Sequence, residues 1–327
     1  MASDELPARH ILAIQGLPTP EVRSLSPDDL ELLANWCTTT YRSLTHDRNS
    51  EEIWRSNIPQ EALRYPFLLD SILAVSALQL AYYSEQDGAQ HIKLLRTSQT
   101  HWIQAHAGLT HQINRVLDRS NCTALFAQCN TQIIFAFAYF QLTARPSAST
   151  SALDRLCRVF RHVRGPTKVL IDLTDIVREG ELASLVTPQV EDPKMPNTSA
   201  IAILGLKRLN MSQEHLGLEA RQTKMVYSQA IDQLESCLAY TTRSSDPGIH
   251  GLLWILRIPS EYLDLLQNRE PFALIILAHY CVIMYHLRKR WWMGDWGVRV
   301  LEEICGLLRR DWLATISWAI DVTSIHV

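Results

Sequence analysis

The feature that most constrains this 327-residue chain is a helix that would be apolar on almost every side. Pro66 opens the run FLLDSILAVSALQLAYY, and the second half of TALFAQCNTQIIFAFAYFQ, which follows Asn121, has the same character. Such a helix offers no face to water, so it has to lie inside a bundle with other helices around it. Two helices of this kind predict a large all-α fold.

Other patterns agree with that fold class. No stretch shows the sustained period-two alternation with hairpin turns that is typical of strands. The longest apolar run, Phe272 to Tyr285, is interrupted by His279 and is shorter than the ~20 residues that a membrane-spanning helix requires. We therefore expect a single large helical bundle domain without a transmembrane segment.

Composition sets the functional limits. Hydrophobic residues make up 47% of the chain and charged residues 20%, which is enough apolar material for a large core. The net charge of -3 and the pI of about 6.5 give no global field that would attract polyanions, so no direct binding of nucleic acid is expected. The seven scattered cysteines favour a reducing compartment, and the acidic start of the sequence does not resemble a secretory signal. These features predict a cytoplasmic or nuclear location.

Prolines and polar strings divide the chain. Residues 1–27 read as a flexible arm, and Ser26 followed by Pro27 reads as the cap and first position of a helix, so the helical domain is expected over 28–327. Gly165-Pro166 is expected to end a helix, and TPQVEDPKMPNTS predicts a mobile linker at about 187–199. Further helices are expected at about 86–117, 123–141, 153–164, 212–241, 249–257, 260–268, 271–292, 296–309 and 311–323.

The sequence lacks the motifs of several enzyme and metal-site classes. It contains no C-x-x-C, so a binuclear zinc cluster has no ligand set here, and it contains no zinc-protease, P-loop, dinucleotide or nucleophile-elbow motif. We expect no metal and no cofactor. Three histidines recur every five residues on one expected helix, and this spacing prevents convergence on one ion, so a surface or partly buried position is the interpretation for His101, His106 and His111.

A row of cations lies on one side of another expected helix. Arginines run at i, i+3 opposite the apolar stripe, and the row consists of Arg155, Arg158, Arg161 and Arg164, with Lys168 after it. Such a row could hold a phosphate or a nucleic-acid backbone. A solvated helix face is the preferred interpretation.

The helix that Pro271 opens carries the best candidate site. Phe272, His279 and His286 stand seven residues apart and so share one face with neighbouring isoleucines, including Ile283. The two histidines are either core residues bonded to carbonyl groups or polar groups in an apolar cavity. Tryptophans follow directly, and indoles offer flat apolar walls with one donor each, although core packing is their commoner use. The candidate ligand-binding residues are His279, Tyr280, Ile283, His286, Trp291, Trp292 and Trp296.

Several segments together resemble a known family. The pieces LELLANWCTTTYRSL, PFLLDSILAVSALQLA, VFRHVRG, EPFALIILAHYCVIMY, WWMGDWG and W-x-x-x-I-x-W are similar in order and spacing to the ligand domain of fungal sterol-uptake-control transcription regulators, over about residues 28–323. The resemblance implies an all-α bundle whose C-terminal helices enclose a hydrophobic pocket for a sterol-like ligand. In that family the domain is joined to an N-terminal zinc cluster that binds DNA.

Two functions follow. The first is a stand-alone domain that acts in fungal secondary metabolism as a cofactor-free cyclase or isomerase on a lipophilic terpenoid, polyketide or sterol-like molecule, because a shaped pocket can hold a reactive conformer. No catalytic acid, base or nucleophile is assigned. The alternative is a ligand-sensing regulator that works through a DNA-binding partner or a missing zinc-cluster exon. In both, the partner is a hydrophobic small molecule, and a homodimer stays open.

Overall fold

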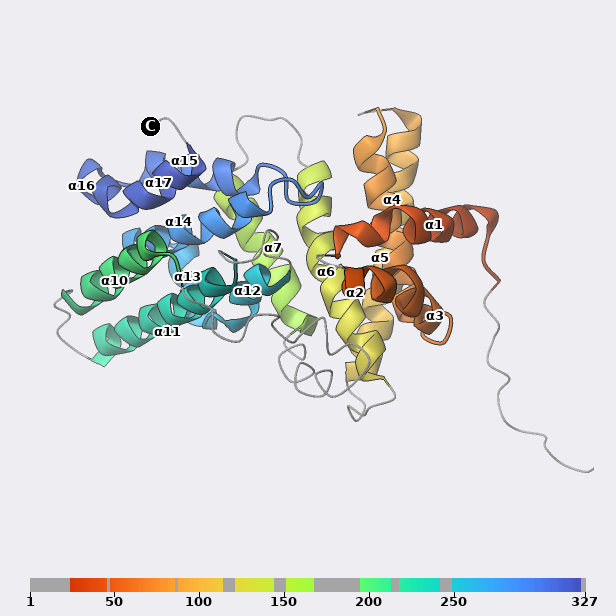
Figure 1. Cartoon of the computed structure of the whole chain (residues 1–327), viewed down its shortest axis with the longest axis horizontal. Helices are drawn as coiled ribbons and strands as arrows, with labels where there is room; N and C mark the ends of the chain where they lie inside the picture. Colours follow the sequence, from red (N-terminus) through yellow and green to blue (C-terminus); the bar gives the residue numbers. More distant parts are fainter. Residues whose placement is uncertain are drawn as a thin grey trace, which may run out of the picture.

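The computed structural model of the chain describes residues 24–45, 48–85, 88–113, 121–143, 151–167, 195–212, 218–241 and 249–324. Within these ranges every regular element is a helix or a helical turn, and none is a strand, so the predicted all-α class is confirmed. The helices run from an N-terminal group at one end of the molecule, through α6 and α7 in the middle, to a C-terminal group at the other end (Figure 1).

The N-terminal group surrounds one buried helix. Its elements are α1 (Pro27–Thr38), the 3-10 turn η1 (Thr40–Ser43), α2 (Arg48–Glu52), the π-helical turn η2 (Ile53–Asn57), α3 (Ile58–Ala62), α4 (Pro66–Tyr83) and α5 (Ala89–Ile113). Every residue from Phe67 to Gln79 of α4 is buried, because α1, α3, α5 and the following α6 pack around it. Helix α5 comes very close at Gly108, where a Cβ atom would lie 2.5 Å from the Cβ of Phe67.

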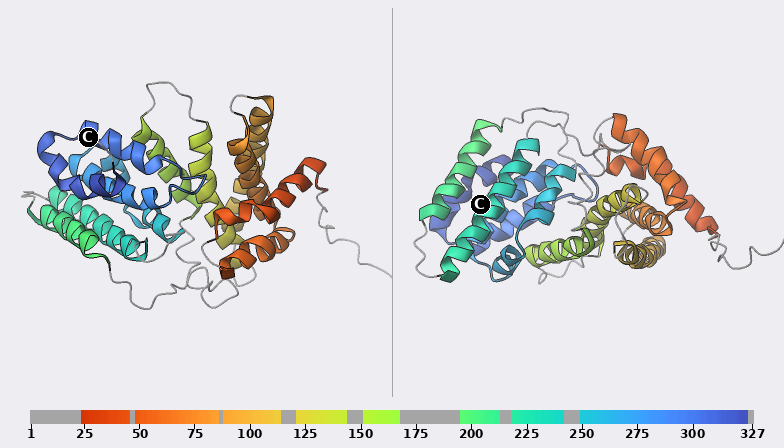
Figure 2. Two further views of the ribbon diagram at one scale, coloured as in Figure 1. Left: turned by 45° about the horizontal axis from the view of Figure 1, so that its top comes forward. Right: turned by 90° about the horizontal axis from the view of Figure 1, so that it is seen from below.

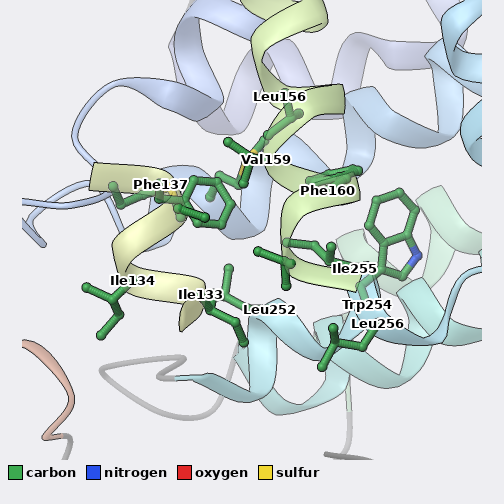
Figure 3. Packing of buried hydrophobic residues seen from close by; sticks show 14 of the residues in the cluster. Ile133, Ile134, Phe137, Leu156, Val159, Phe160, Leu252, Trp254, Ile255 and Leu256 are labelled. Carbon is green, nitrogen blue, oxygen red and sulfur yellow. The ribbon is translucent and has the colours of Figure 1, made fainter. Parts of the chain in front are cut away.

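The middle of the molecule is built from α6 (Cys122–Leu142) and α7 (Ala152–Thr167). Every residue from Ala124 to Ala138 of α6 is buried, as its apolar sequence predicts. Figure 3 shows the core where α6 and α7 meet the C-terminal group, with Phe137, Phe160 and Trp254 among the side chains that fill it. The rings of Phe160 and Trp254 pack edge to face at 6.2 Å, so one continuous core joins the two groups.

The C-terminal group consists of short and long helices around α14. Its elements are α10 (Asn197–Ser212), α11 (Leu218–Thr241), the 3-10 turn η3 (Ile249–Leu252), α12 (Leu253–Arg257), α13 (Ser260–Gln267), α14 (Pro271–His286), α15 (Trp296–Leu307), α16 (Arg310–Leu313), the 3-10 turn η4 (Ala314–Ile316) and α17 (Ser317–Thr323). Helices α10 and α11 lie side by side at the outer edge (Figures 1 and 2). Every residue from Phe272 to Met284 of α14 is buried.

Local signals place the helix starts where the sequence predicts them. Ser26 caps α1: its hydroxyl accepts from the Asp29 amide at 3.1 Å, and the Asp29 carboxylate accepts from the Ser26 amide at 3.0 Å. Pro66 and Pro271 each stand in the first turn of their helix, where the missing N–H costs nothing.

Gly165-Pro166 does not end its helix, which is a correction. Helix α7 continues to Thr167. A proline cannot donate to the carbonyl group four residues earlier, which here is that of His162. The side-chain amide of Gln132 on α6 donates to that carbonyl oxygen at 3.2 Å instead. The freed acceptor therefore keeps a partner, and the last turn of the helix persists.

The segment predicted as a linker ends in a helix. Helix α10 begins at Asn197, within the expected span 187–199, and it precedes the helix that the sequence predicts from 212 onward. Residues 187–194 of the expected linker and residues 1–23 of the expected arm lie outside the described residues. Among the described helices, α4 alone has the length and apolar character needed to cross a membrane, and 78% of that stretch is buried inside the protein.

A tryptophan-rich turn after α14 joins the N-terminal group to the C-terminal group. The indole N–H of Trp291 donates to the Ser43 hydroxyl at 2.6 Å, and that of Trp292 donates to the Ser43 carbonyl at 3.2 Å. The Arg290 guanidinium donates to the carbonyl oxygens of Arg42 and Thr45. We call residues 290–292 the tryptophan clasp, because they hold η1 of the N-terminal group against the C-terminal group.

Candidate functional site: a groove between α10, α14 and α17

An apolar groove with a volume of about 630 Å³ lies between α10 on one side and η4 and α17 on the other. One wall is the face of α10 that carries Ile201, Leu206 and Leu209, and the other includes Trp318. The volume falls within the ~300 to 1,000 Å³ of ordinary small-molecule sites. The groove opens to the surface, since Ile201 at its edge is 70% exposed, whereas the resemblance implies an enclosed pocket.

His279 of α14 is the candidate residue that lines this groove. It is 1% exposed, and its ring stacks on Trp318 with centroids 5.6 Å apart and planes at 21°. Its Nδ1 lies 2.8 Å from the carbonyl oxygen of Ile275, which can only accept, so Nδ1 carries the proton. Burial lowers the pKa of His279 to about 4. The ring is therefore neutral near pH 7, and Nε2 is an acceptor left for a further partner.

The remaining lining is small, apolar or hydroxylated. Gly205 lies midway along the α10 wall, and a Cβ atom built there would meet nothing within 4 Å. Hydroxyl groups stand on both sides, on Thr198 and Ser212 of α10 and on Thr315 and Ser317 opposite. Arg208 is the one charged side chain among the described lining residues. The groove thus combines apolar walls with a few polar groups, which is the usual composition of a site for a lipophilic ligand.

The other candidates on α14 do not line the groove. Tyr280 is fully buried, its ring stacks on Trp254 with centroids 4.2 Å apart, and no described hydrogen-bond partner faces its hydroxyl. Burial raises the pKa of Tyr280 well above its ordinary value. Ile283 is also fully buried. His286 is exposed at the last position of the helix, beside the ring of Tyr285. His279 and His286 therefore do not share one cavity.

The three tryptophans serve contacts between helices. Trp291 and Trp292 belong to the tryptophan clasp, and Trp296 donates to the carbonyl oxygen of Phe137 at 3.3 Å while the Arg155 guanidinium lies 5.7 Å from its ring centroid. None of the three lines the α10–α17 groove. Of the seven candidate residues, the structure places His279 alone at this groove.

The histidines and arginines singled out by spacing have different roles. His101 is buried, in contrast to the expected surface or partly buried position, because its Nε2 lies 3.1 Å from Asp29 of α1 and its Nδ1 lies 2.8 Å from Asp70 of α4. His106 is half-buried and His111 exposed. Within the described ranges, no three His, Cys, Asp or Glu side chains gather to hold a metal ion.

The arginine row is a solvated face only in part. Arg158 and Arg161 are exposed as predicted. Arg155 packs over Trp296, and Arg164 donates to the carbonyl oxygens of Ile255 at 3.0 Å and Ile258 at 2.6 Å. Lys168 lies outside the described residues. These two half-buried arginines hold α7 to its neighbours, so the row is not a continuous anion-binding surface.

Sequence reasoning missed the α10 wall. Ile201, Gly205, Leu206 and Leu209 recur at helical spacing in SAIAILGLKRLN, but no helix was predicted between the expected linker at about 187–199 and the expected helix at about 212–241. Trp318 was quoted only within the W-x-x-x-I-x-W pattern, and no local signal joins it to His279. Helical periodicity across residues 200–210 was the signal that could have found this wall.

Comparison with known proteins gives one informative likeness. No family model matches the chain. The chain is similar to a protein of Gibberella zeae described as a Zn(2)-C6 fungal-type transcription factor, with 22% identity over 312 residues. The alignment takes in 90% of this chain and 61% of that relative's length. The similarity thus extends over nearly the whole helical body, and it supports a fungal transcription-factor-like domain.

Proposed function

We propose that this chain is the regulatory domain of a fungal-type transcription regulator and that it binds a lipophilic small molecule in the α10–α17 groove. The observation that carries the regulatory role is the similarity to a fungal transcription factor over 90% of the chain. The groove adds a place for a ligand, with apolar walls and a neutral histidine on its floor. A regulator of this kind would act in the nucleus, one of the two predicted locations.

Fewer observations support the enzyme hypothesis. The predicted cyclase or isomerase activity finds no support in the comparison with the fungal factor. The described groove residues include no carboxylate or thiol. His279, whose pKa burial lowers to about 4, is a weak base. The regulatory reading therefore replaces it as the main proposal, while the homodimer and the lack of direct DNA binding stay predictions.

A pair of glycine variants tests the groove. Gly205→Leu places a bulky side chain in the groove, where a Cβ atom meets no other atom within 4 Å. Gly306→Leu is the matched control, because a Cβ at Gly306 on α15 also meets nothing within 4 Å and that residue does not line the groove. Nile red, whose fluorescence rises in apolar sites, reports occupancy. We expect Gly205→Leu to reduce dye binding severalfold and Gly306→Leu to leave it unchanged.

The regulatory role is tested in cells. The full chain is fused to a heterologous DNA-binding domain and scored with a reporter gene, with ergosterol and dodecanoic acid as added lipids. We expect reporter output to differ from that of the DNA-binding domain alone, to respond to at least one lipid, and to lose that response in Gly205→Leu but not in Gly306→Leu. A fusion that behaves like the DNA-binding domain alone under every condition would refute the proposal.

A further inference from the structure

The described lining of the groove carries one positive charge and no negative charge, which affects the kind of ligand it can bind. Of the thirteen described residues that line it, Arg208 is the one that carries a charge, and the other twelve are apolar, hydroxylated or, in the case of His279, neutral near pH 7. No described carboxylate lines the groove with it. A cation beside an apolar groove lacks a counter-ion there, and an anionic group on the ligand would supply one.

The neighbouring cation on α10 shows the contrast. Lys207 points to α11, where its ammonium lies 2.6 Å from Glu235 and 3.1 Å from Asp232. Those two carboxylates raise the pKa of Lys207, and they fix α10 against α11. In the described part of the chain Arg208 has no ion pair, and its side chain is exposed at the groove. Lys207 thus stabilises the packing of α10 on α11, whereas Arg208 is available to bind an anion in the groove.

Guanidinium chemistry narrows the class of anion. The planar fork of an arginine donates two parallel N–H bonds to a carboxylate or a phosphate, and these charge-assisted bonds are roughly twice as strong as neutral ones. Apolar walls formed by Ile201, Leu206 and Leu209 require that the rest of the ligand be hydrocarbon. A single cation matches a single negative charge, which favours a monocarboxylate over a doubly charged phosphate group.

We infer, on the basis of the proposed ligand-binding role, that the α10–α17 groove takes a lipophilic carboxylic acid, with its hydrocarbon body between α10 and α17 and its carboxylate on Arg208. Nε2 of His279 lies at the floor as a hydrogen-bond acceptor, so a hydroxyl group on the same molecule would find a partner there. This ligand class differs from a neutral sterol, because its affinity depends on charge.

A matched series of ligands tests the inference directly. Dodecanoic acid, methyl dodecanoate and dodecanol share a hydrocarbon chain and differ in charge, and each is measured below its aggregation limit by displacement of Nile red from the full chain. We expect the acid to bind about tenfold more tightly than the ester or the alcohol, and this advantage to shrink as salt rises. Equal affinity for the three ligands would overturn the inference while leaving the proposed function intact.

Variants of Arg208 locate the effect. Arg208→Gln should abolish the preference for the acid without changing the affinity for the ester, and Arg208→Lys should keep part of it because the charge remains. Arg221→Gln on α11 is the control, since Arg221 is exposed and does not line the groove. A preference that survives in Arg208→Gln would exclude Arg208 as the anchor. Failure of all three ligands to displace the dye from the unmodified chain would instead count against the proposed function.

A final experiment distinguishes binding of a single free acid from binding to a lipid surface. Phosphatidylcholine vesicles with and without phosphatidylserine present a phosphate-bearing surface but no free acid. The inference predicts that the chain does not co-sediment with either kind of vesicle in an Arg208-dependent way. Arg208-dependent binding to the phosphatidylserine vesicles, without a preference for free dodecanoic acid, would contradict it.

Discussion

The imidazole of His279 lies nearly parallel to the indole of Trp318, with ring centroids 5.6 Å apart and planes at 21°. This pair joins α14, the buried helix of the C-terminal group, to α17, which covers it. Both stacked rings line the groove. A change at His279 therefore acts on stability and on the groove together, and the two effects have to be measured separately.

The pH dependence of stability gives the first prediction. Burial lowers the pKa of His279 to about 4, whereas a histidine in an unfolded chain titrates near ~6.5. Between these values the unfolded chain binds a proton that the folded chain does not, so the free energy of unfolding falls as pH is lowered. This part of the stability is complete above about pH 6.5, and about 3 kcal/mol is lost on reaching about pH 4. His279→Phe should remove that dependence.

Urea unfolding, followed by circular dichroism at about pH 7 and about pH 5, measures this pH dependence of the free energy of unfolding. In His279→Phe the free energy of unfolding should change less between the two pH values than in the unmodified chain. His111→Phe is the control, because His111 is exposed on α5. Equal pH dependence in all three proteins would show that His279 is not a buried neutral group. Unchanged binding of Nile red by His279→Phe would also remove this ring from the ligand site.

Two glycines of α15 should respond oppositely to the same substitution. A Cβ atom at Gly297 would lie 2.6 Å from the carbonyl oxygen of Cys281 and 2.9 Å from the amide nitrogen of Tyr285, so Gly297→Ala has to push α15 away from α14. We expect a loss of about 1 to 3 kcal/mol in the free energy of unfolding. Gly306→Ala meets nothing within 4 Å and should be neutral or slightly stabilising. Thermal melts that shift alike would contradict this packing.

The bridge from His101 to Asp29 and Asp70 predicts a third result. His101→Leu removes a partner from both carboxylates at once, and leaving a buried polar group without its partner costs about 1 to 3 kcal/mol. The double variant His101→Leu with Asp70→Leu should recover part of that loss, because it removes a buried hydrogen-bonding group together with its partner. Chemical unfolding of the single and double variants gives the comparison. Additive losses would mean that the two residues do not interact.

Thiol labelling tests whether the cysteines of the core are protected in the folded chain. Burial raises the pKa of Cys129 and Cys237 to about 12 and that of Cys157 to about 11, so these thiols carry almost no thiolate at neutral pH. Cys37 and Cys305 are partly exposed. With Ellman's reagent we expect these two to react first in the folded chain and all seven to react in denaturant. Rapid labelling of Cys129 or Cys237 without denaturant would contradict the described core.

Much of the fold was readable from local signals. The Ser26 cap and the prolines at 66 and 271 fix three helix starts, because each acts on its own turn and needs no distant partner. The Gly165-Pro166 prediction failed for the opposite reason. The amide of Gln132, thirty residues away in the sequence, satisfies the carbonyl oxygen that the proline leaves free.

The candidate site was readable only in part. Helical periodicity singled out His279 as a candidate on one face of α14, and the structure lines a groove with it. The same periodicity grouped it with His286, but the helix ends there, so the shared face leads out of the bundle. Arg208 belongs to α10 and Trp318 to α17, and both line the groove with His279 of α14. Tertiary packing alone places them at the same groove as His279, so sequence spacing could not have predicted that the three residues line one site.

The tryptophan clasp has a consequence for the order in which the chain folds. Its hydrogen bonds join residues 248 and 249 positions apart, so the Ser43 side of the contact is synthesised long before Trp291 and Trp292 leave the ribosome. Contacts of such long sequence separation form late, because the chain entropy of closing the loop is lost before they are made. During synthesis η1 therefore lacks its contact with the indole rings of Trp291 and Trp292. That interval is when a nascent-chain chaperone would find a binding site on this protein.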